Sequence, residues 1–356
     1  MHRSALIFIL LLTGNRSHLE IQHSRTAESL RGVSVVSRHI AWASGTHGTF
    51  LRTTNGGATW IPSQVPGAET IDFRAVTAFS EKDAYLMSAG PGRQSRIYHT
   101  LDAGQHWQLQ FTNTEPKGFF DSMAFWDRTH GVVLGDPIPD RSGTLKFEVL
   151  LTDDGQNWRP VKSAQLPNSL EGEGAFAASN RCIAIVPREN SGTKSDRPAL
   201  DPNIWFATGG SAARVFHSPD RGQSWEVFET PIVHGRDSTG IFAITFRDAL
   251  HGVIAGGDYK EPNHDGSNLA FSEDGGKTWN LSAVHPQAYF SSAAYDKATK
   301  RWFVAAQDFV LAFESSRNPQ RFAPAGSTDA KFNAIATFPD GGALVVGPKG
   351  TVAAIH

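Results

Sequence analysis

The chain has 356 residues, and its 33 Lys and Arg residues nearly balance its 35 Asp and Glu residues, which excludes a strongly basic nucleic-acid face and an acidic tail. Cys182 is the only cysteine, so an intrachain disulfide and a multi-cysteine zinc site are excluded as well. The 34 Gly, 23 Phe and 9 Trp residues are typical of short strands joined by tight turns.

The first 17 residues have the form of a signal peptide. Arg3 is followed by a run of apolar residues, 5–12, which is too short to span a bilayer stably. We therefore expect residues 1–17 to direct export and the protein to be periplasmic or secreted. We expect no transmembrane segment in the mature chain.

Strand patterns begin directly after this leader. Residues 30–36, 39–45 and 49–53 are three predicted strands, and the third runs into the segment TTNGGATW, residues 53–60. Its Asn55 oxygen can accept hydrogen bonds from backbone N–H groups, and its glycines can supply the positive φ of a tight turn. The segment is therefore a predicted turn between a third and a fourth strand.

Variants of this turn segment return four more times, at residues 100–107, 151–158, 218–225 and 272–279. We number these five segments boxes 1 to 5, in chain order. Their shared pattern is S/T-x-D-x-G-x-T-W, with tolerated lapses. The closing Trp residues recur at about the length of a four-stranded propeller blade, so the chain is predicted to be an all-β propeller.

The rest of the chain supports seven blades. Residues 125–135 and 246–256 repeat one strand–turn–strand pattern, and residues 315–322 are a degraded sixth box with Phe322 in place of Trp. The last segment has only three predicted strands, 332–337, 343–347 and 351–355, so residues 18–23 are expected to supply the fourth. We predict one domain, residues 18–356, with its ring closed by this N-terminal strand.

The boxes resemble the Asp-box repeats, or bacterial neuraminidase repeats, of sialidases, xyloglucan hydrolases, sortilin-type receptors and photosystem II assembly factors. The resemblance implies that the boxes are structural turns remote from the functional centre. Residues 30–36, 41–45 and 48–53 with box 1 also resemble the opening blade of the photosystem II stability and assembly factor family and its non-photosynthetic bacterial relatives. That resemblance implies a binding scaffold.

Polar residues at strand ends on the face opposite the boxes are the candidate ligand-binding residues. Asp136 and Asp258 end equivalent strands, and either could cap a turn or face a ligand. In the functional interpretation, carboxylates hold a cation or polar ligand around the central channel while arginines hold a carboxylate or phosphate. The candidate ligand-binding residues are Arg74, Asp121, Asp136, Arg214, Asp258 and Tyr259.

Two functions are compatible with this pattern. The first is an exported, non-catalytic binding or assembly scaffold, monomeric, whose partner is a protein or a polar or carbohydrate ligand on the face opposite the boxes. It uses no cofactor, metal or nucleic acid. The alternative is a secreted sialidase-like or xyloglucanase-like glycoside hydrolase with paired carboxylates among Asp136, Glu173 and Asp258. Against a sialidase, residues 73–76 keep only the first two residues of an F-R-I-P motif.

Overall fold

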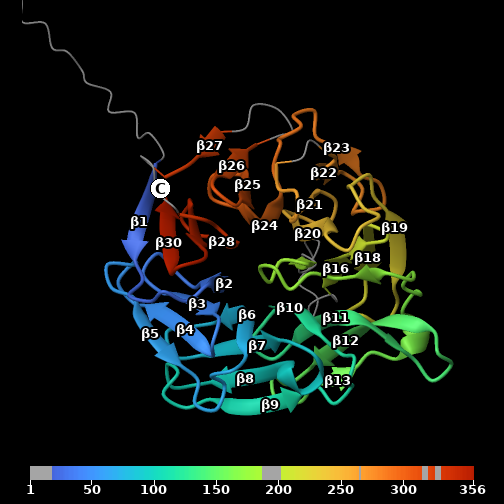
Figure 1. The fold of residues 1–356 in the computed structure, drawn as a ribbon, viewed down its shortest axis with the longest axis horizontal. Helices are drawn as coiled ribbons and strands as arrows, with labels where there is room; N and C mark the ends of the chain where they lie inside the picture. The colour runs from blue at the N-terminus through green and yellow to red at the C-terminus, as the bar shows by residue number, and fades with distance from the viewer. Residues whose placement is uncertain (1–17, 187–201, 264–265, 315–319, 325–329) are drawn as a thin grey trace, which may run out of the picture.

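The computed structural model describes residues 18–186, 202–263, 266–314, 320–324 and 330–356. The predicted signal peptide, residues 1–17, and most of the degraded sixth box lie outside this part of the chain. The described strands form seven sheets arranged in a ring around a central channel (Figure 1), which confirms the seven-bladed β-propeller. No helix among the described residues is long and apolar enough to cross a bilayer.

Each blade is an antiparallel sheet whose first strand lies next to the channel. Blades 1 to 3 take their strands in chain order: β2 (Leu30–Val35), β3 (Ala41–Gly45), β4 (Thr49–Thr53), β5 (Ile61–Gln64); β6 (Asp72–Ala78), β7 (Ala84–Ala89), β8 (Arg96–Thr100), β9 (Gln108–Thr112); β10 (Phe120–Phe125), β11 (Gly131–Pro139), β12 (Leu145–Thr152), β13 (Arg159–Pro160). Short 3-10 turns, η1 (Gly92–Gln94) and η2 (Ser163–Gln165), lie in blade 2 and after blade 3.

The remaining blades differ in one respect, because a short ribbon is added to blade 5. Blade 4 is β15 (Ile183–Val186), β16 (Asn203–Ala207), β18 (Arg214–Ser218) and β19 (Glu226–Glu229), and blade 6 is β24 (Phe290–Asp296), β25 (Arg301–Ala306), β26 (Val310–Phe313) and β27 (Gln320–Phe322). Blade 5 is β20 (Thr239–Phe246), β21 (Gly252–Asp258), β22 (Leu269–Ser272) and β23 (Asn280–Leu281), extended by β17 (Gly209–Gly210) and β14 (Glu173–Gly174).

Blade 7 combines the two ends of the described chain. It consists of β28 (Ala334–Thr337), β29 (Ala343–Val346), β30 (Thr351–Ile355) and β1 (Leu19–His23). β1 pairs antiparallel with β30, from Leu19 opposite Ile355 to His23 opposite Thr351. Gln22 also accepts a 2.9 Å hydrogen bond from the Trp60 indole of box 1. The N-terminal strand is thereby joined to both blade 7 and blade 1.

The core lies between the blades rather than within one. The described residues form seven apolar clusters, and each cluster takes its side chains from two neighbouring sheets. The Trp residue of each box, which immediately precedes the outer strand of its sheet, packs into the cluster shared with the preceding blade. Cys182 is buried in the cluster between blades 3 and 4, and this burial raises the pKa of its thiol.

The five boxes form the same set of hydrogen bonds. In box 5, the Ser272 hydroxyl accepts a bond from the Gly276 amide at 2.8 Å and donates to Asp274 Oδ1 at 2.9 Å. Asp274 Oδ1 also accepts a bond from the Thr278 amide at 3.0 Å. Equivalent bonds occur in boxes 1 to 4. One carboxylate or amide oxygen thus organises each turn.

Acid should weaken the fold through these boxes. Hydrogen bonds from the backbone and side chain of His106 lower the pKa of Asp102 to about 2. Because this value lies below the unfolded-state value of about 3.9, the ionised carboxylate stabilises the fold above about pH 4, and this contribution is lost as pH falls from about 4 to 2. We expect the melting temperature of Asp102→Asn to depend less on pH in this window than that of the wild type, as measured by circular dichroism. Box 1 carries Asn55 at this position, so the variant should fold, and an unchanged pH profile would contradict the assignment.

Candidate functional site

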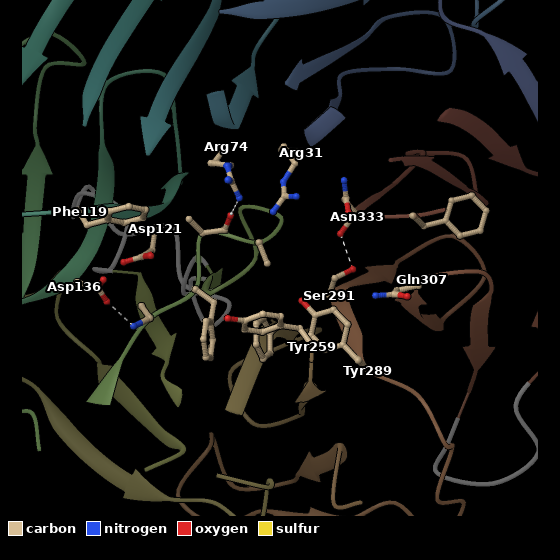
Figure 2. Close-up of a pocket in the computed structure, with 16 residues that line it drawn as sticks. Arg31, Arg74, Phe119, Asp121, Asp136, Tyr259, Tyr289, Ser291, Gln307 and Asn333 are labelled. Atoms are coloured by element: carbon tan, nitrogen blue, oxygen red, sulfur yellow. Dashed lines mark hydrogen bonds between the residues drawn. The ribbon is translucent and has the colours of Figure 1, made fainter. Parts of the chain in front are cut away.

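A pocket of about 460 Å³ lies at the centre of the ring (Figure 2). It is lined by the starts of inner strands and by the residues that follow second strands, so it opens on the face opposite the boxes, which join third and fourth strands. The lining residues that carry the argument below are Arg31, Arg74, Asp121, Asp136, Tyr259, Tyr289, Ser291 and Asn333, together with Phe119, Phe176 and Phe242.

A β-bulge places five of these residues. In blades 1, 2, 3, 5 and 6 the inner strand skips one residue in its pairing with the second strand, and every skipped residue lines the pocket. Bulges bend a strand and redirect one side chain. Here the redirected residues are Arg31, Arg74, Asp121, Phe242 and Ser291.

Glycine opposite the bulge permits this geometry in blades 1, 3 and 5. A Cβ atom on Gly256 would lie 1.9 Å from the Gly240 carbonyl oxygen, one on Gly135 would lie 2.6 Å from the Phe119 carbonyl oxygen, and one on Gly45 would lie 2.7 Å from the Ser29 carbonyl oxygen. All three contacts are with backbone atoms, which cannot move aside as a flexible side chain can. The glycines therefore allow the close approach of the two strands beside the pocket.

A crossing segment, residues 175–182, leads from β14 to β15 and spans the channel. Its backbone accepts hydrogen bonds from Arg74 of blade 2 at Ala177 O (2.9 Å), and its Ser179 hydroxyl donates to Ser291 O of blade 6 (2.6 Å). Arg181 donates to the Ile335 carbonyl of blade 7 at 2.8 Å. The segment is therefore fixed to blades on several sides of the ring, and residues 175–178 form part of the pocket wall.

Two guanidinium groups and two carboxyl groups face the pocket (Figure 2). Arg74 lies 3.6 Å from the Asp72 carboxylate. The Arg31 guanidinium makes no hydrogen bond or ion pair with the described part of the chain, and its Nε is buried. Burial, followed by the charge of Arg74, lowers the pKa of Arg31 to about 10, so Arg31 stays protonated at neutral pH.

The carboxyl groups are held in a poorly solvated environment. Asp121 is 1% exposed, and its Oδ2 has no hydrogen-bond partner among the described residues. Burial, and then the neighbouring Asp136, raise the pKa of Asp121 well above its usual range, although Arg74 opposes the change. Burial also raises the pKa of Asp136, whose Oδ1 accepts a 2.9 Å bond from the Ala175 amide. Burial therefore disfavours the charged form of both carboxyl groups.

Aromatic rings form the apolar side of the pocket. Phe176 of the crossing segment stacks on Phe242 with ring centroids 3.7 Å apart, and Phe242 meets Tyr289 edge to face at 4.7 Å. Tyr259 lies at the rim and is 43% exposed. Figure 2 shows Tyr259 and Tyr289 across the pocket from Arg31 and Arg74.

Four of the predicted ligand-binding residues, Arg74, Asp121, Asp136 and Tyr259, meet at this pocket. Glu173 and Arg214 do not. Arg214 Nε donates to Glu173 Oε1 at 3.0 Å, and the two side chains are 7% and 0% exposed for Arg214 and Glu173 respectively, so they satisfy each other in a separate buried pair. The predicted convergence of both residues on the channel was wrong.

Asp258 was also wrongly placed at the channel. It lines a separate cavity of about 180 Å³ together with Arg236, whose Nη1 is 3.4 Å from Asp258 Oδ2. Asp258 Oδ1 accepts a 2.9 Å bond from the Lys260 amide, which is the turn-capping role considered for it. Burial alone would raise the pKa of Asp258, but hydrogen bonds, first from Ser238, outweigh burial and lower it.

The sequence interpretation missed Arg31, Phe242, Ser291 and Asn333. A signal for them was present, because a large apolar residue, then the pocket residue, then a small residue occur at or near the start of most inner strands. The segments with this pattern are Leu30-Arg31-Gly32, Phe73-Arg74-Ala75, Phe120-Asp121-Ser122, Ile241-Phe242-Ala243, Phe290-Ser291-Ser292 and Phe332-Asn333-Ala334. The bulge repeats with the blade, so its pattern could have been aligned along with the boxes.

No protein-family model matches the chain. It is 25% identical over 307 residues to the chloroplastic photosystem II stability/assembly factor HCF136 of Arabidopsis thaliana, covering 75% of this chain and 70% of that one. It is 22% identical over 253 residues to the photosystem II assembly lipoprotein Ycf48 of Synechococcus sp. (strain CC9902), covering 68% of this chain and 72% of that one.

Solved structures share the fold. The structure described as YCF48 bound to D1 peptide superimposes with a TM-score of 0.62 at 15% identity, covering 95% of this chain and 96% of that one. The GH74 xyloglucanase from Xanthomonas campestris gives a TM-score of 0.63 at 13% identity, covering 95% of this chain and 53% of that one. In sequence, the chain resembles the photosystem II assembly factors HCF136 and Ycf48 over most of its length.

Proposed function

We propose that this protein is a non-catalytic binding scaffold that holds a segment of a partner protein at the pocket opening, on the face opposite the boxes. The observation that carries the proposal is the central pocket itself. It gathers charged, polar and aromatic side chains from blades around the ring, and Asp121 Oδ2 and Arg31 Nε are buried there without a hydrogen-bond partner among the described residues. The terminal nitrogens of Arg31 have no hydrogen-bond or ion-pair partner in the described part of the chain either, and a ligand in the pocket that bonds to them gains affinity.

The relatives support a protein partner. Two sequence relatives are named as photosystem II assembly factors, and a structure with the same fold is described as YCF48 bound to D1 peptide. We extend from these names only the kind of partner, a protein segment, and not its identity. A pocket at the ring centre with an exposed aromatic rim residue, Tyr259, suits a chain segment entering from solvent.

We also propose that the protein acts outside the cytoplasm. The apolar leader, residues 1–17, supports this location, as does the similarity to a lipoprotein and to a chloroplastic factor. A fusion of residues 1–17 to a phosphatase that is active only after export tests it. We expect phosphatase activity from this fusion, and we expect it to disappear when two Asp residues interrupt the apolar run, residues 5–12. Phosphatase activity that does not depend on the leader would overturn the proposal.

Site-directed photo-crosslinking tests the proposed face. A photoreactive phenylalanine analogue at position 259 should crosslink a discrete partner in an extract of the source organism, and excess unmodified protein should compete for it. The matched control is position 101, because Leu101 is 69% exposed in box 2 on the opposite face. Crosslinking of the same partner from position 101 alone would move the interface to the box face and overturn the proposal.

The glycoside hydrolase alternative now depends on a different carboxyl pair. Glu173 and Asp258 are bound elsewhere, whereas Asp121 and Asp136 share the pocket and both have raised pKa values. Purified protein should leave a panel of chromogenic glycosides and xyloglucan unhydrolysed. Turnover that Asp136→Asn abolishes would replace the scaffold proposal with a hydrolase.

A further inference from the structure

We propose that the central pocket is a receptor for one organic carboxylate, which Arg31 and Arg74 bind through their guanidinium groups while the aromatic wall covers its apolar body. The inference deepens the proposed function, because it assigns a ligand chemistry to the same opening. The carboxylate could belong to a free small molecule or to the end of a bound protein segment, and the experiment below separates these two sources.

The two arginines occupy equivalent positions in neighbouring blades. Each is the bulged residue of its inner strand, and Figure 2 shows their guanidinium groups next to each other at one side of the pocket. The Nε atoms of both are buried without a hydrogen-bond partner among the described residues. Two adjacent cations repel each other, and an anion bound between them offsets this repulsion. A planar carboxylate can accept two parallel hydrogen bonds from a guanidinium group.

The charge of the site favours a monoanion over a dianion. Arg74 already has the Asp72 carboxylate 3.6 Å away and donates to Ala177 O, whereas Arg31 has no ionic partner in the described part of the chain. One negative charge on a ligand would therefore balance Arg31, because burial disfavours the charged forms of Asp121 and Asp136 in the same pocket. A phosphate dianion would bring one charge more than the arginines leave uncompensated, at a desolvation cost.

Asp121 adds a second polar contact. Its Oδ2 is buried without a partner in the described structure, and a carboxyl oxygen can accept a hydrogen bond in either protonation state. It suits a hydroxyl group on the ligand rather than a second carboxylate. The body of the ligand then lies against Phe119, Phe176 and Phe242, and a cavity of about 460 Å³ is large enough for a ring and its substituents.

Paired probes test the inference with the full mature chain. Titration calorimetry should detect binding of phenylacetate and 4-hydroxyphenylacetate. Their primary amides should bind at least about tenfold more weakly, as expected for loss of a charge-assisted bond. Short peptides ending in Phe or Tyr, with a free or an amidated C-terminus, form the second arm. Inorganic phosphate is the third probe and should bind more weakly than the acids.

Variants assign the binding to the arginines. Arg31→Gln should weaken binding of the acids at least about tenfold, and Arg52→Gln, on β4 of the same blade and away from the pocket, should not change it. Circular dichroism melts of both variants show whether they fold. Binding by free-carboxyl peptides alone assigns the carboxylate to a protein segment, and binding by the small acids alone assigns it to a free molecule.

Three results would overturn the inference: no acid of either arm binds, the amides bind as tightly as the acids, or Arg31→Gln leaves binding unchanged. Tighter binding of phosphate would overturn the assignment to a monocarboxylate. The photo-crosslinking experiment at position 259 distinguishes failure of this inference from failure of the proposed function. If its capture persists while no acid binds, the scaffold stands and the carboxylate receptor fails.

Discussion

Glu173→Ala should lower the free energy of unfolding by about 3–5 kcal/mol, because it leaves the Arg214 guanidinium buried without its counter-ion. The Glu173 side chain is 0% exposed and that of Arg214 is 7% exposed. Glu173 also accepts a 2.7 Å bond from the Thr208 hydroxyl and a 2.9 Å bond from the Leu170 amide. The variant therefore strands donors from three residues at once, next to the strand pairing of β14 with β17.

Chemical denaturation followed by circular dichroism measures this effect. The matched control is Asp153→Ala, which removes an ion-pair partner of Arg159. The Arg159 side chain is 58% exposed, so this variant should change the free energy of unfolding by less than about 1 kcal/mol. A second variant, Glu173→Leu with Arg214→Met, should recover part of the loss because it removes both charges. Equal losses for Glu173→Ala and Asp153→Ala would contradict the argument.

Trp205→Ala should cost about 3–5 kcal/mol of unfolding free energy, the range for removal of a large core aromatic side chain. Trp205 is 0% exposed and stacks on Phe246 of the next blade with ring centroids 3.9 Å apart. Its indole N–H donates to the Gly275 carbonyl of box 5 at 2.8 Å. One side chain therefore joins the apolar interface between blades 4 and 5 to a box turn.

Trp205→Phe separates the two contributions. It keeps a stacking ring but leaves the Gly275 carbonyl without this donor, and should cost distinctly less than the alanine variant. The corresponding contact between blades 2 and 3 is the Tyr85 hydroxyl, which donates to Gly155 O at 2.7 Å, so Tyr85→Phe provides a comparison that removes the hydroxyl alone. A Trp205→Ala loss no larger than that of Tyr85→Phe would show that ring burial at this interface is unimportant.

The fold could be predicted because its information is repeated. Five boxes and their Trp residues mark blade after blade, so the all-β class did not depend on any single segment, whereas the count of seven also required the degraded sixth box and the closing strand at residues 18–23. The ribbon of β14 and β17 was not predicted. Each strand is two residues long, which is too short to carry an alternating pattern, and its pairing depends on contacts that only the closed ring creates.

About half of the site was predictable, and the reason differs by residue. Arg74 and Asp121 lie at strand starts, where topology alone places a side chain near the channel. Glu173 and Arg214 were misplaced because an ion pair between residues distant in sequence is decided by packing, not by blade position. Arg31 occupies the equivalent bulge position in blade 1, so the argument that found Arg74 and Asp121 applied to it as well and was not extended to the first blade.

The pairing of β1 with β30 has a consequence for synthesis of the chain. Residues 19–23 leave the ribosome before blades 1 to 6 are made, but their partners, residues 351–355, emerge only after those six blades. Blades 1 to 6 can form in order while blade 7 cannot, so the nascent protein is an open arc with an unpaired edge and an uncovered apolar face until the last strand arrives. A chain that lacks β30 would therefore be an unclosed arc prone to aggregation, and not a slightly smaller ring.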